Sequence, residues 1–213
     1  MIWNLEDALT DIAQQFNLDA DALKRYAAEA PDIGGFAPGQ QNGKWTVGCI
    51  WEVDGVMLYA LVRAMKPRHC LEVGTFYGCS SRYIIAALRD NGFGHLTTMD
   101  NGDAGGPGPQ FTDEELEIVN EIRMDLFDYQ MPSNKYDFVF EDAMHSTAQV
   151  HHIWGMFKEV APDNAMIISH DAEQFLVGQA VRAGISAVTD QYKTYLVPPG
   201  DCGMAIWRKT YRG

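Results

Sequence analysis

The sequence contains few cationic side chains and no apolar run long enough to cross a membrane. Its 213 residues include 16 Lys and Arg against 29 Asp and Glu, which gives a formal net charge of −13. Nucleic acid or an anionic membrane surface would repel such a chain. A transmembrane helix needs ~20 apolar residues, and polar residues between Asn4 and Asp11 interrupt any secretory signal. We therefore expect a soluble protein without a nucleic-acid or membrane partner.

Cysteine is also scarce. The four cysteines, at positions 49, 70, 79 and 202, form no Cys-x-x-Cys pair and show no cysteine–histidine spacing typical of zinc sites. Cys70 and Cys79 lie in apolar segments, where a reduced cysteine behaves as a small hydrophobic side chain. A reducing cytoplasm is therefore the expected location.

The first quarter of the chain is helical and then irregular. Apolar residues recur at helical spacing over residues 4–17, and a second helix runs from Asp19 to the stop at Pro31. Residues 31–48 are rich in Gly, Pro, Gln and Asn, which predicts an irregular arm whose Trp45 could close over a substrate. We assign residues 1–50 to the same domain as residues 51–213.

The remainder alternates helices and strands. A helix over residues 52–65 precedes strands at 69–73, 95–99, 122–124, 136–140 and 165–169. Helices are expected at 80–88, after Thr112 (a capping box with Glu115), at 149–160 and at 175–188, with a hairpin of 193–197 and 204–207 at the end. This order predicts an α/β fold: a doubly wound, mostly parallel seven-stranded sheet with a C-terminal antiparallel hairpin and N-terminal helices.

Distinctive residues follow the predicted strand ends. These are Gly74, Asp100, Asp125, Asp142 and the pair His170–Asp171. Open α/β sheets bind ligands beyond the carboxyl ends of their strands, near the point where the strand order reverses. We therefore expect the functional site at this edge of the sheet.

Residues 71–80, Leu-Glu-Val-Gly-Thr-Phe-Tyr-Gly-Cys-Ser, form a strand, a glycine turn and a helix start. The glycines are spaced G-x-x-x-G, so both the dinucleotide motif G-x-G-x-x-G and the P-loop G-K-[S/T] are missing here. Bulky Phe76 and Tyr77 between the glycines favour a ligand without phosphates, whose carboxylate could meet Ser80 and the helix N–H groups. A plain tight turn is the alternative.

Asp100 ends the second strand, where a carboxylate can accept both hydroxyls of a ribose. The alternative is a loop aspartate that precedes an Asn101–Gly102 turn. The glycine turn and Asp100 together favour a cofactor that contains adenosine.

Three segments together resemble class I S-adenosylmethionine-dependent methyltransferases: Leu71–Ser80, Asp100 and Phe138–Ser146. The likeness is closest to the branch of catechol O-methyltransferase-type enzymes and the O-methyltransferases of antibiotic-sugar and macrolide tailoring. It runs from about Glu52 to Trp207. Departures are Thr75–Phe76, where many members carry a further glycine, and Glu141, where an apolar residue is usual. The resemblance implies a small-molecule O-methyltransferase with S-adenosylmethionine contacts at Glu72, Gly74, Phe76, Ser80, Asp100, Asn101, Asp125 and Asp142.

Asp142 and the pair His170–Asp171 end adjacent predicted strands, so their side chains could converge. Two carboxylates with an imidazole suit Mg²⁺ or Mn²⁺, and the resemblance implies a metal at the same positions. His170 stands where the family usually offers an oxygen ligand, so a softer metal or none is the alternative.

His145 is the expected general base, with Asp142 as the second catalytic residue, because an imidazole titrates near neutral pH. The alternative is a helix-start residue beside the cap Ser146. His151 and His152, further along, are expected at the surface or in the core.

Other functions remain open on the same scaffold, namely a hydroxylase-like activity or a non-catalytic cofactor-binding protein. A nucleic-acid methyltransferase is disfavoured by charge and by the missing Asn/Asp-Pro-Pro-Tyr signature. The apolar stripes of the N-terminal helices predict a homodimer, unless these helices simply cover the sheet of their own chain.

Overall fold

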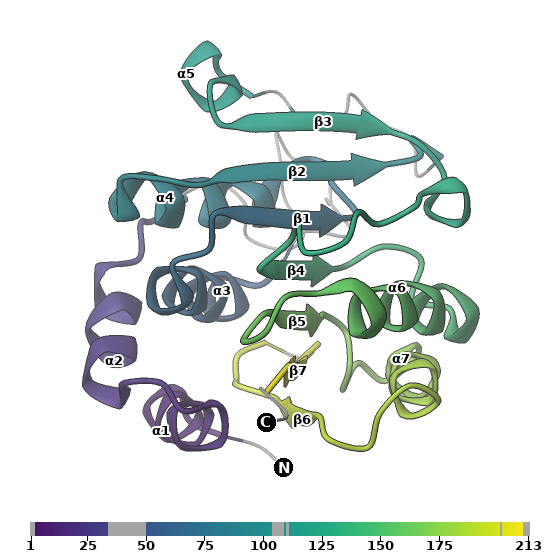
Figure 1. Ribbon diagram of the computed structural model, residues 1–213. Helices are drawn as coiled ribbons and strands as arrows, with labels where there is room; N and C mark the ends of the chain where they lie inside the picture. The colour runs from purple at the N-terminus through teal and green to yellow at the C-terminus, as the bar shows by residue number, and fades with distance from the viewer. Residues whose placement is uncertain (1–2, 34–49, 104–108, 110, 201, 211–213) are drawn as a thin grey trace, which may run out of the picture.

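The computed structural model describes residues 3–33, 50–103, 109, 111–200 and 202–210 (Figure 1). Most of the predicted irregular arm, with Trp45, lies outside the described residues. Among the described residues no helix combines the length and the apolar character that crossing a membrane requires.

A seven-stranded sheet forms the centre of the molecule. Its strands are β1 (His69–Val73), β2 (His95–Asp100), β3 (Val119–Arg123), β4 (Phe138–Glu141), β5 (Met166–Ser169), β6 (Lys193–Tyr195) and β7 (Met204–Arg208). They lie in the order β3-β2-β1-β4-β5-β7-β6. Strands β1 to β5 pair in parallel, whereas β7 runs antiparallel to both β5 and β6. The predicted fold and hairpin are confirmed, and the strand order reverses between β1 and β4.

Helices cover both faces of the sheet (Figure 1). They are α1 (Leu5–Phe16), α2 (Ala20–Glu29), α3 (Glu52–Met65), α4 (Cys79–Asn91), α5 (Asp113–Leu116), α6 (Thr147–Val160) and α7 (Gly178–Ser186), with a 3-10 turn η1 (Leu126–Asp128). Alternate strand residues point to opposite faces. Phe138 and Phe140 of β4 pack in one core with α1 to α4. Val139 packs in a second core with α6 and α7.

The N-terminal helices pack on their own chain. The apolar residues of α1, among them Leu9 and Ile12, are buried in the core that also contains α3. The Tyr195 hydroxyl donates to the Asp11 carboxylate at 2.8 Å, which ties α1 to β6. The apolar stripe that suggested a homodimer is therefore used within the chain.

Several element boundaries differ from the sequence prediction, among them the starts of α7 and β3. Helix α7 begins at Gly178 rather than Phe175, because the Gln174 side chain accepts the N–H groups of Leu176 and Val177 in a turn. Strand β3 begins at Val119 rather than at residue 122. Helix α5 is only one turn long, so the chain after it is extended and pairs with β2 from Val119 onward. The capping box at the start of α5 is present as predicted.

Candidate active site

The glycine turn between β1 and α4 rests on a buried carboxylate. Glu72 is fully buried and accepts hydrogen bonds from the hydroxyls of Ser80 at 2.6 Å, Ser81 at 2.5 Å and Thr98 at 2.6 Å. Burial raises the pKa of Glu72 to about 7, although the three hydroxyls act against the shift. Both Glu72 and Ser80 were predicted cofactor contacts, and the structure joins them beneath the turn.

The turn itself fits tightly against the end of β4. Gly74 has a φ of +101°, and a Cβ there would lie 2.0 Å from the carbonyl oxygen of Asp142. A side chain at position 74 would therefore separate the ends of β1 and β4. Gly78 caps α4 without a side-chain hydrogen bond, so the first helix N–H groups have no side-chain cap.

Asp100 joins the turn from the end of β2. Its carboxylate accepts the backbone N–H of Phe76 at 2.9 Å and that of Gly102 at 2.6 Å. A carboxylate has about four acceptor sites, so capacity for further donors remains. Asn101 bonds Asp103 in the same loop at 3.0 Å.

Asp125 follows β3, next to Met124, whose backbone N–H donates to the Asp100 carbonyl at 3.1 Å. It caps η1 by accepting the Phe127 N–H at 2.8 Å, and it is exposed. The structure thus brings Gly74, Phe76 and Asp100 together, while Asp125 stands in the loop after β3.

Three side chains converge beyond β4 and β5. Nε2 of His145 lies 3.0 Å from Oδ1 of Asp142 and 3.0 Å from Oδ2 of Asp171. His145 and Asp171 have φ values of 54° and 57°, in the left-handed region that ordinary side chains rarely adopt. We call Asp142, His145 and Asp171 the Asp–His cluster; each of its side chains is between 13% and 19% exposed.

His170 lies beneath the Asp–His cluster and is buried. Its Nδ1 lies 3.3 Å from Oδ1 of Asp142 and 3.7 Å from Oδ1 of Asp171, and its Nε2 lies 3.0 Å from Oδ2 of Asp54. Both ring nitrogens therefore face carboxylates.

Asp54, on α3, is 1% exposed and was missed by sequence reasoning. The available signal was an acidic residue inside a helix whose neighbours Val53 and Met57 are apolar.

The carboxylates and imidazoles shift one another's titration. Burial alone would lower the pKa of His145, but its ion pairs with Asp142 and Asp171 raise the pKa to about 10. Burial would also lower the pKa of His170. The carboxylates of Asp142 and Asp54 outweigh burial and hold this pKa well above its usual value. Burial would raise the pKa of Asp142, yet His170 and His145 lower it. Both imidazoles thus hold their protons near neutral pH in this arrangement.

The donor atoms form two compact groups that share Asp171. One is the Asp–His cluster, and the other contains His170, Asp171 and Cys202. In each group the donor atoms lie within 4.8 Å of one another. Of the predicted metal ligands, Asp142 and Asp171 meet in the first group with His145, while His170 faces them from below. Cys202 lies in the segment before β7. The spacing of the cysteines in the sequence did not indicate a metal site there.

Glu141, one of the departures from the family pattern, is fully buried behind the Asp–His cluster. It accepts the Ser169 hydroxyl at 2.6 Å and the Gln149 amide at 2.8 Å, and Gln149 in turn accepts the Met144 N–H at 3.0 Å. Burial raises the pKa of Glu141. This network holds the loop that carries Asp142 and His145.

The two later histidines lie away from the Asp–His cluster. His151 is exposed on α6, and the His152 ring lies 5.2 Å from the ring of Phe127. Ser146 caps α6 by accepting the Gln149 N–H at 3.2 Å. His145 therefore precedes the cap, and its side chain contacts Asp142 and Asp171.

Residues 71–172 match a protein family described as a methyltransferase domain. Over this segment the chain is similar to a methyltransferase domain. The matched segment contains most of β1, all of β2 to β5, and every predicted site residue from Glu72 to Asp171. A search of curated proteins found no match.

Solved structures share the fold across most of the chain. The O-methyltransferase TomG from Streptomyces achromogenes, in complex with SAM, is 17% identical with a TM-score of 0.56; the match covers 89% of this chain and 99% of TomG. SAH-bound PaMTH1 from Podospora anserina is 15% identical with a TM-score of 0.54, over 100% and 98% of the two chains. The Bacillus cereus O-methyltransferase, in complex with SAH, is 13% identical with a TM-score of 0.51, over 98% of each. These structures share the fold, and the matched family is a methyltransferase domain, as the sequence resemblance implied.

Proposed function

We propose that this protein transfers a methyl group from S-adenosylmethionine to a hydroxyl of a small molecule. One observation carries the proposal. The turn between β1 and α4, which Asp100 contacts through the Phe76 N–H, meets the Asp–His cluster at the carboxyl edge of the sheet. Gly74 makes the connection, because its absent side chain lets the β1 turn contact the backbone of Asp142. The β1–α4 turn and the titratable side chains of the Asp–His cluster thus lie side by side where the strand order reverses.

The residues around the turn fit S-adenosylmethionine. Asp100 keeps acceptor capacity for ribose hydroxyls beyond its two backbone bonds. The α4 N-terminus offers N–H groups to a carboxylate, and no phosphate-binding motif competes for this role. When bound, S-adenosylmethionine supplies an electrophilic methyl group. Asn101 and Asp125 complete the proposed contacts from the next two loops.

The Asp–His cluster fits a divalent cation such as Mg²⁺ or Mn²⁺. Octahedral bonds of ~2.1 Å at right angles place neighbouring ligand atoms ~3.0 Å apart, which matches the two 3.0 Å distances from His145. Ion pairs between an imidazole and a carboxylate have the same length as these distances. The chemistry of the donor atoms is therefore a second criterion for a metal site. An imidazole and two carboxylates suit Mn²⁺ or a similar transition ion at least as well as Mg²⁺. Asp142 and Asp171 would hold the ion, and a bound ion would help an acceptor hydroxyl to ionise.

His145 has two candidate roles, general base or metal ligand. As a base it must start neutral, whereas its two ion pairs favour the protonated ring. As a ligand it would complete the donor set with Asp142 and Asp171. His170, held by Asp54 and Asp142, positions Asp142 in either case.

The acceptor is proposed to have an apolar part. Met144, Phe175 and Leu176 are 62%, 96% and 78% exposed, and they lie in the same two loops as the Asp–His cluster. Exposed apolar side chains in the loops that carry a polar site favour a partly apolar ligand.

Formation of S-adenosylhomocysteine tests the proposal. The purified protein is incubated with labelled S-adenosylmethionine, Mg²⁺ or Mn²⁺, and a panel of phenols and sugar hydroxyls. We expect labelled product with at least one acceptor, and loss of that product in Asp142→Asn. Cofactor binding without transfer to any acceptor would support a non-catalytic protein instead, and a requirement for oxygen would support a hydroxylase-like reaction.

Two further assignments belong to the proposal. A cytoplasmic location agrees with the scarcity of cysteine, four residues in 213. A homodimer is retained as a prediction, although the stripe on α1 no longer supports it. Light scattering at working concentration distinguishes a dimer from a monomer.

A further inference from the structure

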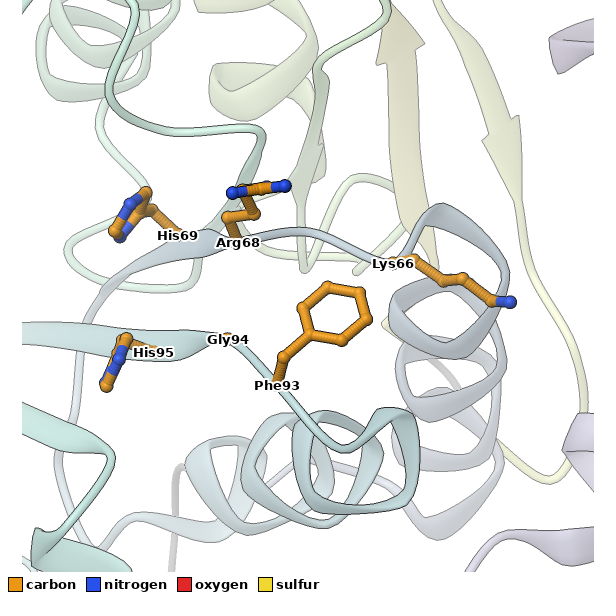
Figure 2. Close-up of a pocket in the computed structure, with 6 residues that line it drawn as sticks. All are labelled: Lys66, Arg68, His69, Phe93, Gly94 and His95. Carbon is orange, nitrogen blue, oxygen red and sulfur yellow. The ribbon is translucent and has the colours of Figure 1, made fainter.

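A hollow lies at the amino ends of β1 and β2, the opposite edge of the sheet from the Asp–His cluster. Its volume is about 610 Å³, within the range of ligand pockets. The lining residues are Lys66, Arg68, His69, Phe93, Gly94 and His95, shown in Figure 2. They come from the link between α3 and β1 and the link between α4 and β2, together with the first residue of each strand.

Glycine shapes the floor of this hollow. Gly94 has a φ of +107°, and a Cβ there would lie 2.7 Å from the Pro67 carbonyl oxygen. The two links therefore pass in close contact. His69 and His95 are partners in the β1–β2 register, and their rings lie 6.3 Å apart at 20°. The paired strands thus hold two imidazoles side by side.

The lining is cationic in a strongly acidic chain. It contains a lysine, an arginine and two of the six histidines but no carboxylate, although the net charge of the protein is −13. The nearby Asp137 carboxylate accepts the backbone N–H of Arg68 at 2.6 Å. Within the described residues, neither Lys66 nor Arg68 forms a salt bridge.

A second hollow shows that this composition is not general. Its lining contains Arg182 and Lys193, but Asp190 lies among them. Four cation-capable side chains without a carboxylate therefore distinguish the first hollow, and they would attract an anion.

An exposed aromatic ring completes the hollow. Phe93 is 47% exposed, and Figure 2 shows its ring between the side chains of Arg68 and Lys66. A ring in this position offers a face for stacking, and the guanidinium of Arg68 can pair with a phosphate or carboxylate.

We propose that this hollow binds a small aromatic anion, a planar ring that carries a phosphate or carboxylate. The ring contacts Phe93, and the anionic group lies toward Arg68 and the His69–His95 pair. The site is separate from methyl transfer, because it occupies the other edge of the sheet.

An NMR titration of the ¹⁵N-labelled protein with phenyl phosphate tests the proposal. We expect saturable shifts confined to residues 66–69 and 93–95. Phe93→Ala and the double variant Arg68→Gln/His95→Gln should each weaken binding at least tenfold. Lys193→Ala removes one positive charge from β6, as Arg68→Gln does from the hollow, and should leave binding unchanged. Circular dichroism should show that every variant is folded.

Two comparison probes separate the parts of the ligand. Inorganic phosphate and phenol should each bind at least tenfold more weakly than phenyl phosphate. Equal binding of inorganic phosphate, together with no effect of Phe93→Ala, would overturn the aromatic part of the proposal. An absence of saturable shifts, or shifts centred on Asp100 and Asp142, would overturn the site itself.

Discussion

The carboxylate of Asp54 lies 3.0 Å from Nε2 of His170, which links helix α3 to the end of strand β5. Both side chains are buried. Because Nδ1 of His170 faces Asp142, the Asp54 carboxylate orients the imidazole that in turn contacts the Asp–His cluster. A helix outside the matched methyltransferase domain thereby reaches its proposed active site.

Asp54→Asn tests this link. Asparagine keeps an acceptor for the imidazole but removes the charge, so we expect a loss of about 1–3 kcal/mol in the free energy of unfolding. Methyl transfer should slow, while affinity for S-adenosylmethionine should stay within about threefold. Urea unfolding, calorimetry and turnover on the same preparation measure the three quantities. Unchanged turnover would show that Asp54 only stabilises the fold.

Asp100→Ala should weaken binding of S-adenosylmethionine by about 1–3 kcal/mol, because ribose hydroxyls would lose their acceptor. Asp103→Ala is the matched control, since Asp103 is exposed in the same loop and its carboxylate accepts a hydrogen bond from Asn101. Calorimetry with each variant measures the affinity. Equal affinities for the two variants would remove Asp100 from the cofactor site.

The Asp–His cluster should bind Mn²⁺. A chelator should abolish methyl transfer, and Mn²⁺ or Mg²⁺ should restore it. Asp142→Asn should lower Mn²⁺ affinity at least tenfold, whereas Asp163→Asn, an exposed acid at the opposite edge of the sheet, should not change it. Electron paramagnetic resonance counts free Mn²⁺ directly. Full activity in chelator would leave a mechanism without metal.

His145→Ala distinguishes the two roles of this residue. Loss of Mn²⁺ affinity together with turnover would identify a ligand. Retained Mn²⁺ affinity, with a rate that recovers as the pH approaches the pKa of the acceptor hydroxyl, would identify a general base. The measurements are Mn²⁺ binding and a pH–rate profile of the variant beside the wild type.

Glu72→Gln should change how stability depends on pH. Below about pH 4.5, the ordinary value, Glu72 is protonated in both the folded and the unfolded chain. As the pH rises toward about 7 the unfolded chain ionises first, so the stability that comes from the raised pKa is lost over this window. The loss amounts to about 3 kcal/mol at most.

The difference between wild type and Glu72→Gln isolates this effect from the repulsion of the other acidic groups. Urea unfolding from pH 4 to pH 8 should show the wild type losing stability relative to the variant as the pH rises. A constant difference across this range would mean that Glu72 titrates normally.

The sequence by itself determined the alternation of strands and helices, and therefore the parallel sheet, because side-chain periodicity follows from local backbone geometry. It also placed Gly74, Asp100, Asp142 and Asp171 at strand ends, and parallel strands bring their carboxyl ends to one edge. Those residues meet in the structure as the pattern predicts.

Only the tertiary structure decided which imidazole lies between the carboxylates and which lies beneath them. The left-handed backbone at His145 turns its ring toward Asp142 and Asp171, and no spacing rule encodes that rotation. Asp54 is 116 residues from His170 along the chain, so their contact depends on how α3 packs on the sheet. The apolar stripe of α1 likewise could cover its own chain or a partner, and packing against the shared core settled its use. Contacts between distant segments are set by how whole faces fit together, which residue order alone does not fix.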